Sequence, residues 1–446
     1  MKTIIIGGGL AGLSVAYFLS EYSSGEIILL EEEKDLGGLA GSYARGGYFI
    51  EKFYHHIFSS DAFIQQIIKE LGLTEKLEWR TASIGYYMDG KIHRLNTPLE
   101  ILRFEKLSFF DKVLLVKAVL SARRLKDPFA FDDVPATRWV IEKTNRSVYE
   151  KFFEPLFKGK FGEYENISAA WLLSRVKLRS NRTLKGERLG YLRGGFQQLI
   201  DKMAEKVESQ GCEMRRGCEV TRLMIANNKV EGVETTEGFL ASDNVIITTP
   251  SLSKALSPYR ARGKAPEGFA GARAEPVMGQ SHTIDKIRYQ CTICALFGLE
   301  RSLMEDIYWL NIKADVPFGA IIEHTNLLPR ADYGETLFYV VSYVQEEDEL
   351  WKKSDKEIID LYLEGIEKLF HDFHREDVKW WELARGRFTA PVYELGYKSK
   401  IIPYSSHIEG LYLAGIFSSP NYPERSMNGS LRAGFECARE VMKREL

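Results

Sequence analysis

Apolar and polar residues near the N-terminus alternate in a way that predicts a strand, a helix and a second strand. The first strand is Met1–Ile6, the helix is Leu13–Tyr22, and the second strand runs from Glu26 to Leu30 and ends at Glu31. A glycine-rich turn separates the first strand from the helix. The apolar part of the first strand is too short for a signal sequence or a membrane span, so we expect neither. This stretch therefore predicts a compact βαβ unit.

Between about Thr97 and Asn181 the pattern becomes largely helical, with Pro128 and Pro135 as breaks. Within this lobe the Leu and Val residues of Phe109–Ala122 recur at helical spacing, and charged residues interrupt them. This predicts an amphipathic helix rather than a membrane span. We expect the helix to cover the core; contact with a membrane surface or with an apolar substrate channel is the alternative.

Strands and helices alternate again in the remainder of the chain. The predicted elements are a helix at Phe196–Gln210, strands at Cys212–Val220, Lys229–Val233 and Asn244–Thr249, β-rich runs at Cys291–Phe297, Gly319–Ile322 and Leu337–Tyr343, a helix at Lys356–Phe370, a strand at Leu411–Gly415 and a helix beginning near Gly434. The runs beyond Gln290 indicate a second, mixed α/β domain. Gly, Ala, Pro and Arg fill Ser257–Gly279, which predicts a mobile loop or a disordered insertion.

The composition is that of an ordinary globular protein. With 446 residues, 45% of them hydrophobic, the chain is long enough for two or three domains. The formal net charge of −2 lacks the basic excess that nucleic-acid binding usually leaves, so we expect no nucleic-acid partner. The 5 cysteines form a sparse, odd set, which favours a reducing, cytoplasmic setting.

Two of these cysteines, Cys291 and Cys294, form a C-x-x-C pair inside a β-rich run. A structural zinc site needs four ligands, and no second pair accompanies this one in the sequence. We therefore interpret both cysteines as buried core residues and expect no metal site.

The turn after the first strand carries the pattern G-x-G-x-x-G at Gly7, Gly9 and Gly12, with Leu10 and Ala11 between the last two. These glycines permit a tight turn and let backbone N–H groups approach a pyrophosphate. The N-terminus of the following helix also attracts negative charge. The turn therefore predicts a nucleotide-binding site.

An acidic residue follows at the distance that dinucleotide sites require. Glu31 ends the second strand, where its carboxylate can accept hydrogen bonds from ribose hydroxyls. Glu32 is the nearest alternative. A carboxylate at this position disfavours a 2′-phosphate, so we expect a dinucleotide without one.

A second glycine turn favours FAD over NAD. Gly37 and Gly38, followed by Leu39 and Ala40, begin shortly after Glu31. With this turn the chain resembles the flavin amine oxidase superfamily, which includes protoporphyrinogen oxidase and phytoene desaturase. In that family the paired glycines lie along the FAD diphosphate, and Leu39 stands where many amine oxidases carry Arg. The resemblance implies that FAD is the cofactor.

The resemblance continues in further segments along the chain. They are Tyr191–Phe196 with Gly217–Val220, Asn244–Pro250, Arg387–Tyr393 with Gly396, and Leu411–Gly415 with Arg425–Ser430. The cofactor-binding residues that it implies are Gly7, Gly9, Leu10, Ala11, Gly12, Glu31, Glu32, Gly37, Gly38, Leu39, Ala40, His55, Val220, Pro250, Gly415, Ser426, Met427 and Asn428. Because no Cys lies in Arg425–Ser430, we expect FAD to be bound without a covalent bond.

Two adjacent histidines mark the segment Tyr54–Phe58. It resembles a stretch of UDP-galactopyranose mutase, a related flavoprotein in which a His lies against the isoalloxazine ring, and the match falls on His56. Because the pKa of imidazole lies near neutrality, His56 is our candidate catalytic residue, either tuning the flavin or relaying a proton. The alternative is that His55 and His56 only pack and hydrogen-bond under the cofactor.

The resemblance implies an α/β fold in which a discontinuous, Rossmann-like FAD-binding domain carries an inserted mixed α/β substrate domain and a helical lobe. We predict residues 1–95, 190–256 and 396–446 for the FAD-binding domain, 97–189 for the lobe and 280–395 for the substrate domain. Five aromatic residues are candidates for a substrate pocket: Tyr308, Trp309, Trp380, Trp381 and Tyr393.

Three functions are compatible with these features. The leading prediction is an FAD-dependent oxidoreductase, protoporphyrinogen oxidase-like or amine oxidase-like, that transfers hydride from an unidentified small-molecule substrate to flavin. The alternative is a non-redox sugar-nucleotide mutase, for which Arg175, Arg288, Arg387 and Arg425 are candidate ligands of a UDP diphosphate. The third is a flavin-binding module without enzymatic activity, against which the large aromatic second domain argues.

Overall fold

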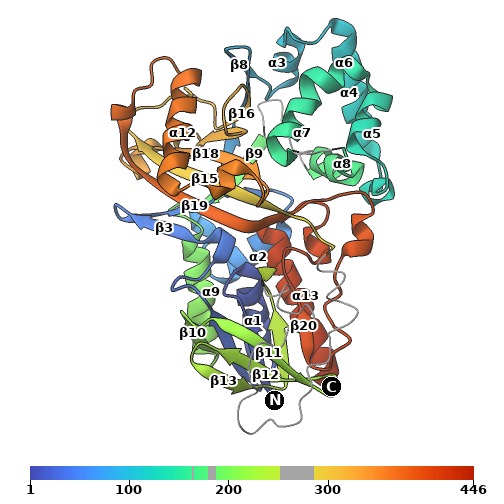
Figure 1. Ribbon diagram of the computed structural model, residues 1–446, viewed down its shortest axis with the longest axis vertical. Coiled ribbons are helices and arrows are strands. Elements are labelled where there is room, and N and C mark those ends of the chain that lie inside the picture. The colour runs from blue at the N-terminus through green and yellow to red at the C-terminus, as the bar shows by residue number, and fades with distance from the viewer. Residues whose placement is uncertain (163–164, 179–186, 252–285, 446) are drawn as a thin grey trace.

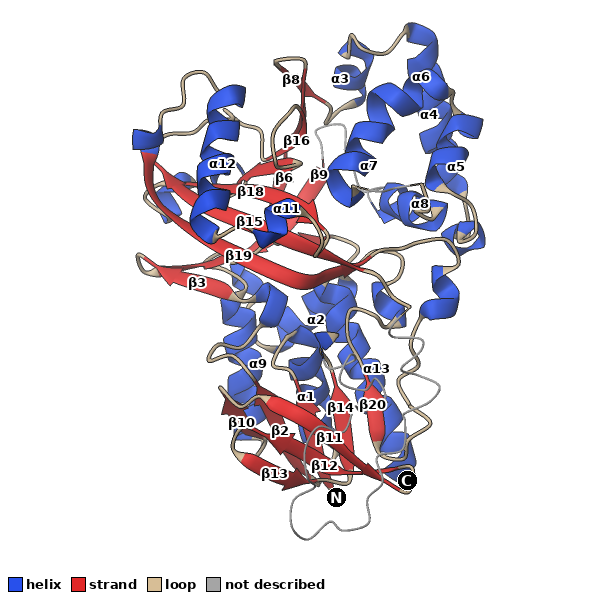
Figure 2. Ribbon diagram, viewed as in Figure 1, coloured by secondary structure: helices blue, strands red, loops and turns tan. Residues whose placement is uncertain are grey.

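The computed structural model of the chain describes residues 1–162, 165–178, 187–251 and 286–445 (Figure 1). Both termini lie at one end of the molecule, next to a parallel sheet and its helices. A larger sheet lies above this part, and a lobe of helices stands beside the larger sheet at the opposite end (Figure 2). Ser257–Gly279, which we predicted to be a mobile loop, lies outside the described residues.

The first sheet consists of five parallel strands in the order β10-β2-β1-β14-β20. Their bounds are Lys2–Ile6 for β1, Glu26–Glu31 for β2, Glu213–Arg216 for β10, Asn244–Ile247 for β14 and Leu411–Leu413 for β20. Strands from both ends of the chain thus share one sheet. Because parallel strands end at the same edge, the loops that follow β1, β2, β14 and β20 gather there.

Both faces of this sheet are covered. Ile5 and Ile27 pack against a layer formed by helices α1 (Leu10–Tyr22), α9 (Gln197–Ser209) and α13 (Met427–Glu445). Ile4 and Ile28 point the other way, toward the three-stranded sheet β11-β12-β13 (Val220–Ala226, Lys229–Thr235 and Gly238–Ala241). Burial on two faces explains why these strands are almost continuously apolar. The predicted βαβ unit is confirmed, with its helix beginning at Leu10 instead of Leu13.

Helix α13 begins at Met427, so the predicted start near Gly434 was wrong. The Ser426 side chain accepts a hydrogen bond from the Gly429 N–H at 2.9 Å, which supports the first turn. Gly434 is needed for packing, since a Cβ there would lie 2.6 Å from the Cβ of Ser14 on α1. Gly434 therefore allows the first and last helices to pack closely.

The second large sheet has seven strands in the order β19-β15-β18-β17-β16-β7-β8. Their bounds are Ile84–Met88 for β7, Lys91–Arg94 for β8, Tyr289–Leu299 for β15, Trp309–Lys313 for β16, Ala320–Glu323 for β17, Thr336–Val344 for β18 and Val378–Pro391 for β19. Phe338 and Val340 pack against α12 (Asp355–Leu369), whereas Tyr339 and Val341 face the parallel sheet's helices. The β-rich runs predicted beyond Gln290 are confirmed as strands of this sheet.

The lobe consists of α3 (Pro98–Arg103), α4 (Phe109–Arg124), α5 (Ala136–Lys143), α6 (Arg146–Val148), α7 (Glu154–Phe161) and α8 (Ala169–Leu178). The two predicted breaks are confirmed. Pro128 is the first residue of a short 3₁₀ helix, and Pro135 directly precedes α5. Both positions suit proline, which has no N–H to donate.

Shorter elements complete the fold. They are the hairpin of β3 (Ser42–Arg45) and β4 (Tyr48–Glu51), the small sheet of β5 (Ile57–Phe58), β9 (Glu187–Leu192) and β6 (Leu77–Ala82), and the helices α2 (Ala62–Glu70) and α11 (Glu349–Lys352). The mixed α/β character of the fold is confirmed. The domain boundaries stay predictions, and β7 and β8 join the large sheet although they precede residue 95.

Candidate functional site

The first glycine turn lies at the carboxyl edge of the parallel sheet, against the end of β14. Gly7 has a φ of 105°, and a Cβ there would lie 2.7 Å from Oγ1 of Thr248. A Cβ on Gly12 would collide with the Gly7 carbonyl oxygen. The Thr248 hydroxyl donates a hydrogen bond to the Ile6 carbonyl at 2.8 Å. The turn therefore requires glycine at these two positions, as its sequence predicts.

Glu31, rather than Glu32, faces this turn. Oε2 of Glu31 accepts a hydrogen bond from the Gly8 N–H at 2.5 Å, and Oε1 accepts one from the Glu33 N–H at 2.9 Å. Glu31 is buried, whereas Glu32 is exposed. Desolvation and the neighbouring carboxylates of Glu31 and Glu33 raise the pKa of Glu32. The turn's backbone thus already contacts the Glu31 carboxylate.

The second glycine turn lies directly against the first. The Gly37 N–H donates to the Gly8 carbonyl at 2.9 Å. A Cβ on Gly38 would lie 3.4 Å from Cα of Gly9, and Leu39 and Ala40 continue the turn. On the other side, the Cys218 N–H donates to the Glu31 carbonyl at 2.9 Å and places Val220 beside the end of β2.

The C-terminal segments join the same edge. A Cβ on Gly415 would lie 3.0 Å from the carbonyl oxygen of Thr248, two residues before Pro250. Asn421, which is fully buried, donates from Nδ2 to the Gly415 carbonyl at 3.0 Å and accepts from the Ser426 N–H at 3.1 Å. Asn421 thereby fixes the start of α13. Sequence reasoning missed it, because Asn in a loop gives no signal of this bridging role.

Met427 and Asn428 form the first turn of α13. Oδ1 of Asn428 accepts a hydrogen bond from the Ile64 N–H of α2 at 3.0 Å, and Met427 is buried. The N-terminus of α13 is thus held by α2 as well as by Asn421. Helix N-termini favour negative charge.

The two histidines lie between the parallel sheet's edge and the large sheet. Nδ1 of His55 is 2.5 Å from the Phe53 carbonyl oxygen, which can only accept, so Nδ1 carries the proton. Burial, assisted by the charge of Arg425, lowers the pKa of His55 to about 4, so this ring is neutral at pH 7. His56 is half-buried, and its Nδ1 lies 3.3 Å from the Tyr308 hydroxyl.

Aromatic side chains of the large sheet pack around Tyr54. The Tyr54 hydroxyl hydrogen-bonds with that of Tyr343, and its ring meets Trp309 edge-on at a centroid distance of 4.8 Å. Tyr339 lies 6.5 Å away by the same measure. Tyr339 and Tyr343 share one face of β18 because side chains alternate along a strand. We call Tyr54, Tyr308, Trp309, Tyr339 and Tyr343 the aromatic wall.

The other predicted pocket residues lie elsewhere. Nε1 of Trp380 donates to Glu335 at 2.9 Å beneath the guanidinium of Arg45, and Trp381 is exposed. Tyr393 is buried and donates to the Asn421 carbonyl. Of the five aromatic candidates, only Tyr308 and Trp309 belong to the wall.

The four candidate arginines differ in their partners. Arg175 pairs with Glu424 at 2.9 Å, Arg288 with Glu394 at 3.2 Å and Arg387 with Glu346 at 3.4 Å. Among the described residues no carboxylate lies within ion-pair distance of Arg425. Burial raises the pKa values of the Tyr54 and Tyr343 hydroxyls, and the nearby positive charge of Arg425 offsets part of this rise.

The C-x-x-C cysteines are core residues, as predicted. Cys291 packs on the α12 side of β15 and Cys294 on the opposite side. Burial raises the pKa of each thiol to about 12, so neither is a thiolate at neutral pH. Within the described ranges no group of three or more His, Cys, Asp or Glu residues could hold a metal ion.

A buried carboxyl group, Glu51, was missed by sequence reasoning. Its carboxylate accepts hydrogen bonds from the Tyr191 hydroxyl and the Phe196 N–H, both at 2.7 Å. The Tyr339 hydroxyl donates to the Glu51 carbonyl at 2.7 Å, which ties the aromatic wall to β4. Burial outweighs these hydrogen bonds and raises the pKa of Glu51 to about 7. One acid in a mixed-polarity strand gives no sequence signal of burial.

Glu51→Gln tests this raised pKa. Between the ordinary carboxyl pKa of 4.5 and about 7, folded protein keeps a proton that the unfolded chain has lost, so stability falls as pH rises through this window. Glutamine cannot titrate. We expect the stability of wild type relative to E51Q to fall by on the order of 3 kcal/mol between about pH 4.5 and 7.

Urea unfolding at several pH values measures this difference. Glu305→Gln, which removes a surface charge, is the matched control and should keep the wild-type pH profile. A pH-independent difference between wild type and E51Q would mean that Glu51 keeps an ordinary pKa in the folded protein.

Comparison with known proteins agrees with this geometry. A family model described as flavin containing amine oxidoreductase matches residues 10–442. The chain is 22% identical to 15-cis-phytoene desaturase, chloroplastic/chromoplastic, of Glycine max, over 99% of this chain and 80% of that one. A crystal structure from Exiguobacterium sp. 255-15, named as a candidate protoporphyrinogen oxidase, matches with a TM-score of 0.77 at 17% identity over 99% of both chains.

Reduced UDP-galactopyranose mutase also has this fold, with a TM-score of 0.72 at 16% identity over 99% of this chain and 95% of that one. Such identities show a shared fold and not a shared reaction. The family model, in contrast, covers almost the whole chain and confirms the predicted resemblance. The chain belongs to the flavin containing amine oxidoreductase family, whose members are oxidoreductases, and FAD is its cofactor.

Proposed function

We propose that FAD lies along the carboxyl edge of the parallel sheet, with its diphosphate at the first glycine turn. No side chain caps the first turn of α1, and that turn contains no acidic residue. Its N–H groups and the positive end of the helix suit a diphosphate. Gly9 provides room, since an added Cβ would meet no atom closer than 3.9 Å.

The predicted residues then divide along the length of FAD. Glu31 accepts hydrogen bonds from the ribose, with Glu32 outside the contact, and Val220 lies against the adenine. Both glycine turns and Gly415 surround the diphosphate. Pro250, His55 and the first turn of α13 are nearest to the flavin. The two glycine turns comprise Gly7, Gly9, Leu10, Ala11, Gly12, Gly37, Gly38, Leu39 and Ala40. The start of α13 comprises Ser426, Met427 and Asn428.

Glu31→Gln and Glu32→Gln separate the two candidate ribose ligands. The substitution at residue 31 replaces a buried carboxylate oxygen that accepts the Gly8 N–H, and it weakens hydrogen bonds to ribose. We expect E31Q to raise the FAD dissociation constant about tenfold or more and E32Q to change it less than about threefold. Flavin fluorescence during titration of the apo-protein measures both. Equal effects of the two substitutions would contradict the assignment.

We further propose that the enzyme dehydrogenates a hydrophobic substrate bound against the aromatic wall. The wall itself carries this proposal, because Trp309, Tyr339 and Tyr343 all contact Tyr54. Tyr308 joins this group to the site, since its ring lies 6.1 Å from that of His56. FAD, when bound, supplies the acceptor for a hydride from substrate carbon. Tyr54, Trp309 and Tyr343, which are partly exposed, provide apolar contact area, and the buried Tyr308 and Tyr339 support them from behind. Neutral His55 adds no charge that would repel or attract the substrate.

Removal of hydride leaves a proton to be transferred from substrate. We propose that His56 accepts it, because its imidazole is half-buried and held in place by the Tyr308 hydroxyl. Tyr308 acts as a positioning residue. The two relatives named for phytoene desaturation and protoporphyrinogen oxidation support a polyene or a porphyrinogen as the substrate class.

An anaerobic reduction assay tests the reaction. The FAD-loaded enzyme is mixed in turn with a polyene, a porphyrinogen and putrescine, and bleaching of the visible flavin band is followed. We expect the polyene or the porphyrinogen to bleach the flavin and putrescine to leave it oxidised. Reduction by putrescine alone would contradict a hydrophobic substrate.

The same assay tests His56. His56→Asn should lower the rate of flavin reduction by about 10²-fold and flatten the pH profile of that rate, because asparagine cannot take up the proton. The absorbance spectrum of bound FAD serves as the control for folding. An unchanged rate and pH profile would remove His56 from the reaction.

The mutase remains the second candidate, and the arginines count against it. Three of its four candidate diphosphate ligands already pair with carboxylates, and only Arg425 lacks such a partner among the described residues. Conversion of UDP-galactopyranose to its furanose isomer by the reduced enzyme, without consumption of an electron acceptor, would overturn the oxidoreductase proposal.

A further inference from the structure

Helix α4 of the lobe has two apolar faces, only one of which is buried. Leu115, Ala118 and Ala122 face the interior. At about 100° per residue, Phe109, Val116 and Leu120 lie on the opposite side of the helix, and all are exposed. The predicted amphipathic helix thus covers the core with one face and leaves a second apolar stripe uncovered.

Further large apolar side chains of α4 and α3 are exposed. Phe110 is 66% exposed and Phe109 78%, which is unusual for such large apolar side chains. On α3, Leu99 and Leu102 are 55% and 50% exposed. We call these two leucines, Phe109, Phe110, Val116 and Leu120 the outer face. An exposed group of large apolar side chains is typical of an interaction site.

Basic residues surround the outer face. Residues 98–126 contain seven Lys and Arg but three Asp and Glu, a formal charge of +4 in a chain whose net charge is −2. Arg103, Lys117, Arg123 and Arg124 are exposed. Among the residues that the structure describes, no acidic side chain forms an ion pair with any of these four.

The acidic residues of this stretch mostly point into the protein. Glu100 accepts hydrogen bonds from the Asn96 and Thr97 N–H groups at 2.8 and 2.7 Å. Asp111 is buried and accepts from Nδ2 of Asn145 at 2.7 Å. The Glu100 and Asp111 carboxylates therefore hydrogen-bond within the capping boxes of α3 and α4. The surface around them keeps an excess of positive charge.

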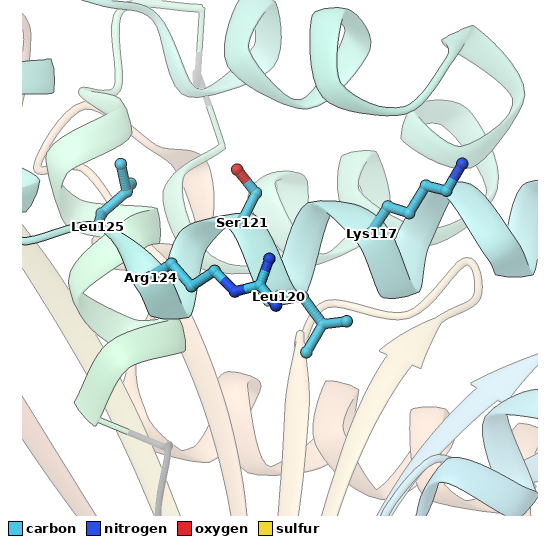
Figure 3. A pocket seen from close by; sticks show the side chains of 5 residues that line it. All are labelled: Lys117, Leu120, Ser121, Arg124 and Leu125. Atoms are coloured by element: carbon cyan, nitrogen blue, oxygen red, sulfur yellow. The ribbon is translucent and has the colours of Figure 1, made fainter.

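A shallow hollow lies where apolar and basic groups meet. It has a volume of about 380 Å³ and is lined by Lys117, Leu120, Ser121, Arg124 and Leu125 (Figure 3). Figure 3 shows the Arg124 guanidinium beside Leu120 on the same side of α4. A cation and a hydroxyl next to a leucine match the chemistry of a phosphate group attached to an acyl chain.

We propose that the outer face of α3 and α4 binds a membrane surface that contains anionic lipids. Its apolar side chains enter the boundary between headgroups and acyl chains, and the surrounding Lys and Arg contact lipid phosphates. The lobe lies at the end of the molecule opposite both termini (Figure 1). In the described part of the chain no helix is long and apolar enough to cross a membrane.

Vesicle co-sedimentation of the FAD-loaded full chain tests this surface. One set of vesicles contains phosphatidylcholine alone, and the other contains equal parts of phosphatidylcholine and phosphatidylglycerol. We expect at least about tenfold stronger partitioning to the anionic vesicles, reduced by high salt. Charge reversal by R123E with R124E, or removal of apolar contact by F109N with F110N, should each reduce it about tenfold or more.

Matched controls come from other exposed sites. Lys202→Glu with Lys206→Glu reverses two exposed charges on α9, and Phe239→Asn removes an exposed ring on β13. Both should bind like wild type, and every variant should keep the wild-type FAD spectrum. Equal partitioning to both vesicle types, absence of binding, or indifference to the α4 substitutions would overturn the proposal. A dimer in gel filtration that F109N with F110N dissociates would identify a second copy as the occupant instead.

Discussion

Backbone atoms from the two ends of the chain must meet at one sheet edge with almost no side chains between them. The Thr248 N–H donates to the Ile6 carbonyl at 3.0 Å, and the Ala414 N–H donates to the Ile247 carbonyl at 3.0 Å. Gly7 and Gly415 both abut Thr248 so closely that a Cβ on either would press against it. The glycine turns, the packing of α13 on α1 and the placement of Glu31 all follow from this close approach.

Local chemistry made this edge predictable. A turn that needs glycine, a strand buried on both faces and an acid at its end leave their signals within a short stretch of sequence. Asn421 and Glu51 left none. The Asn421 amide bridges Gly415 and Ser426, and Asn in a loop has no pattern that reveals such a bridge. The partners of the Glu51 carboxylate, Tyr191 and Phe196, lie in another part of the chain. The start of α13 was missed for a related reason, since the close approach of Gly434 to Ser14, seven residues inside the helix, is a contact between the two ends of the chain.

The aromatic wall and the outer face show the same limit. Strand periodicity predicts that Tyr339 and Tyr343 share a face, but not that Tyr54 reaches Tyr343 from the other side. Helical periodicity predicts an apolar stripe on α4, but two stripes are present, and only the fold decides that Leu115 is covered and Leu120 is not. Which apolar surface remains open is a property of the assembled lobe.

Competition between FAD, FMN and ADP for the apo-protein tests the proposed cofactor position most directly, because the glycine turns and Glu31 are assigned to the adenosine and diphosphate half. Flavin fluorescence should report one FAD per chain, displacement of FAD by ADP, and at least about hundredfold weaker binding of FMN, which lacks the adenosine half. Binding of FMN as tight as that of FAD, with no competition by ADP, would contradict the assignment of the carboxyl edge as the dinucleotide site.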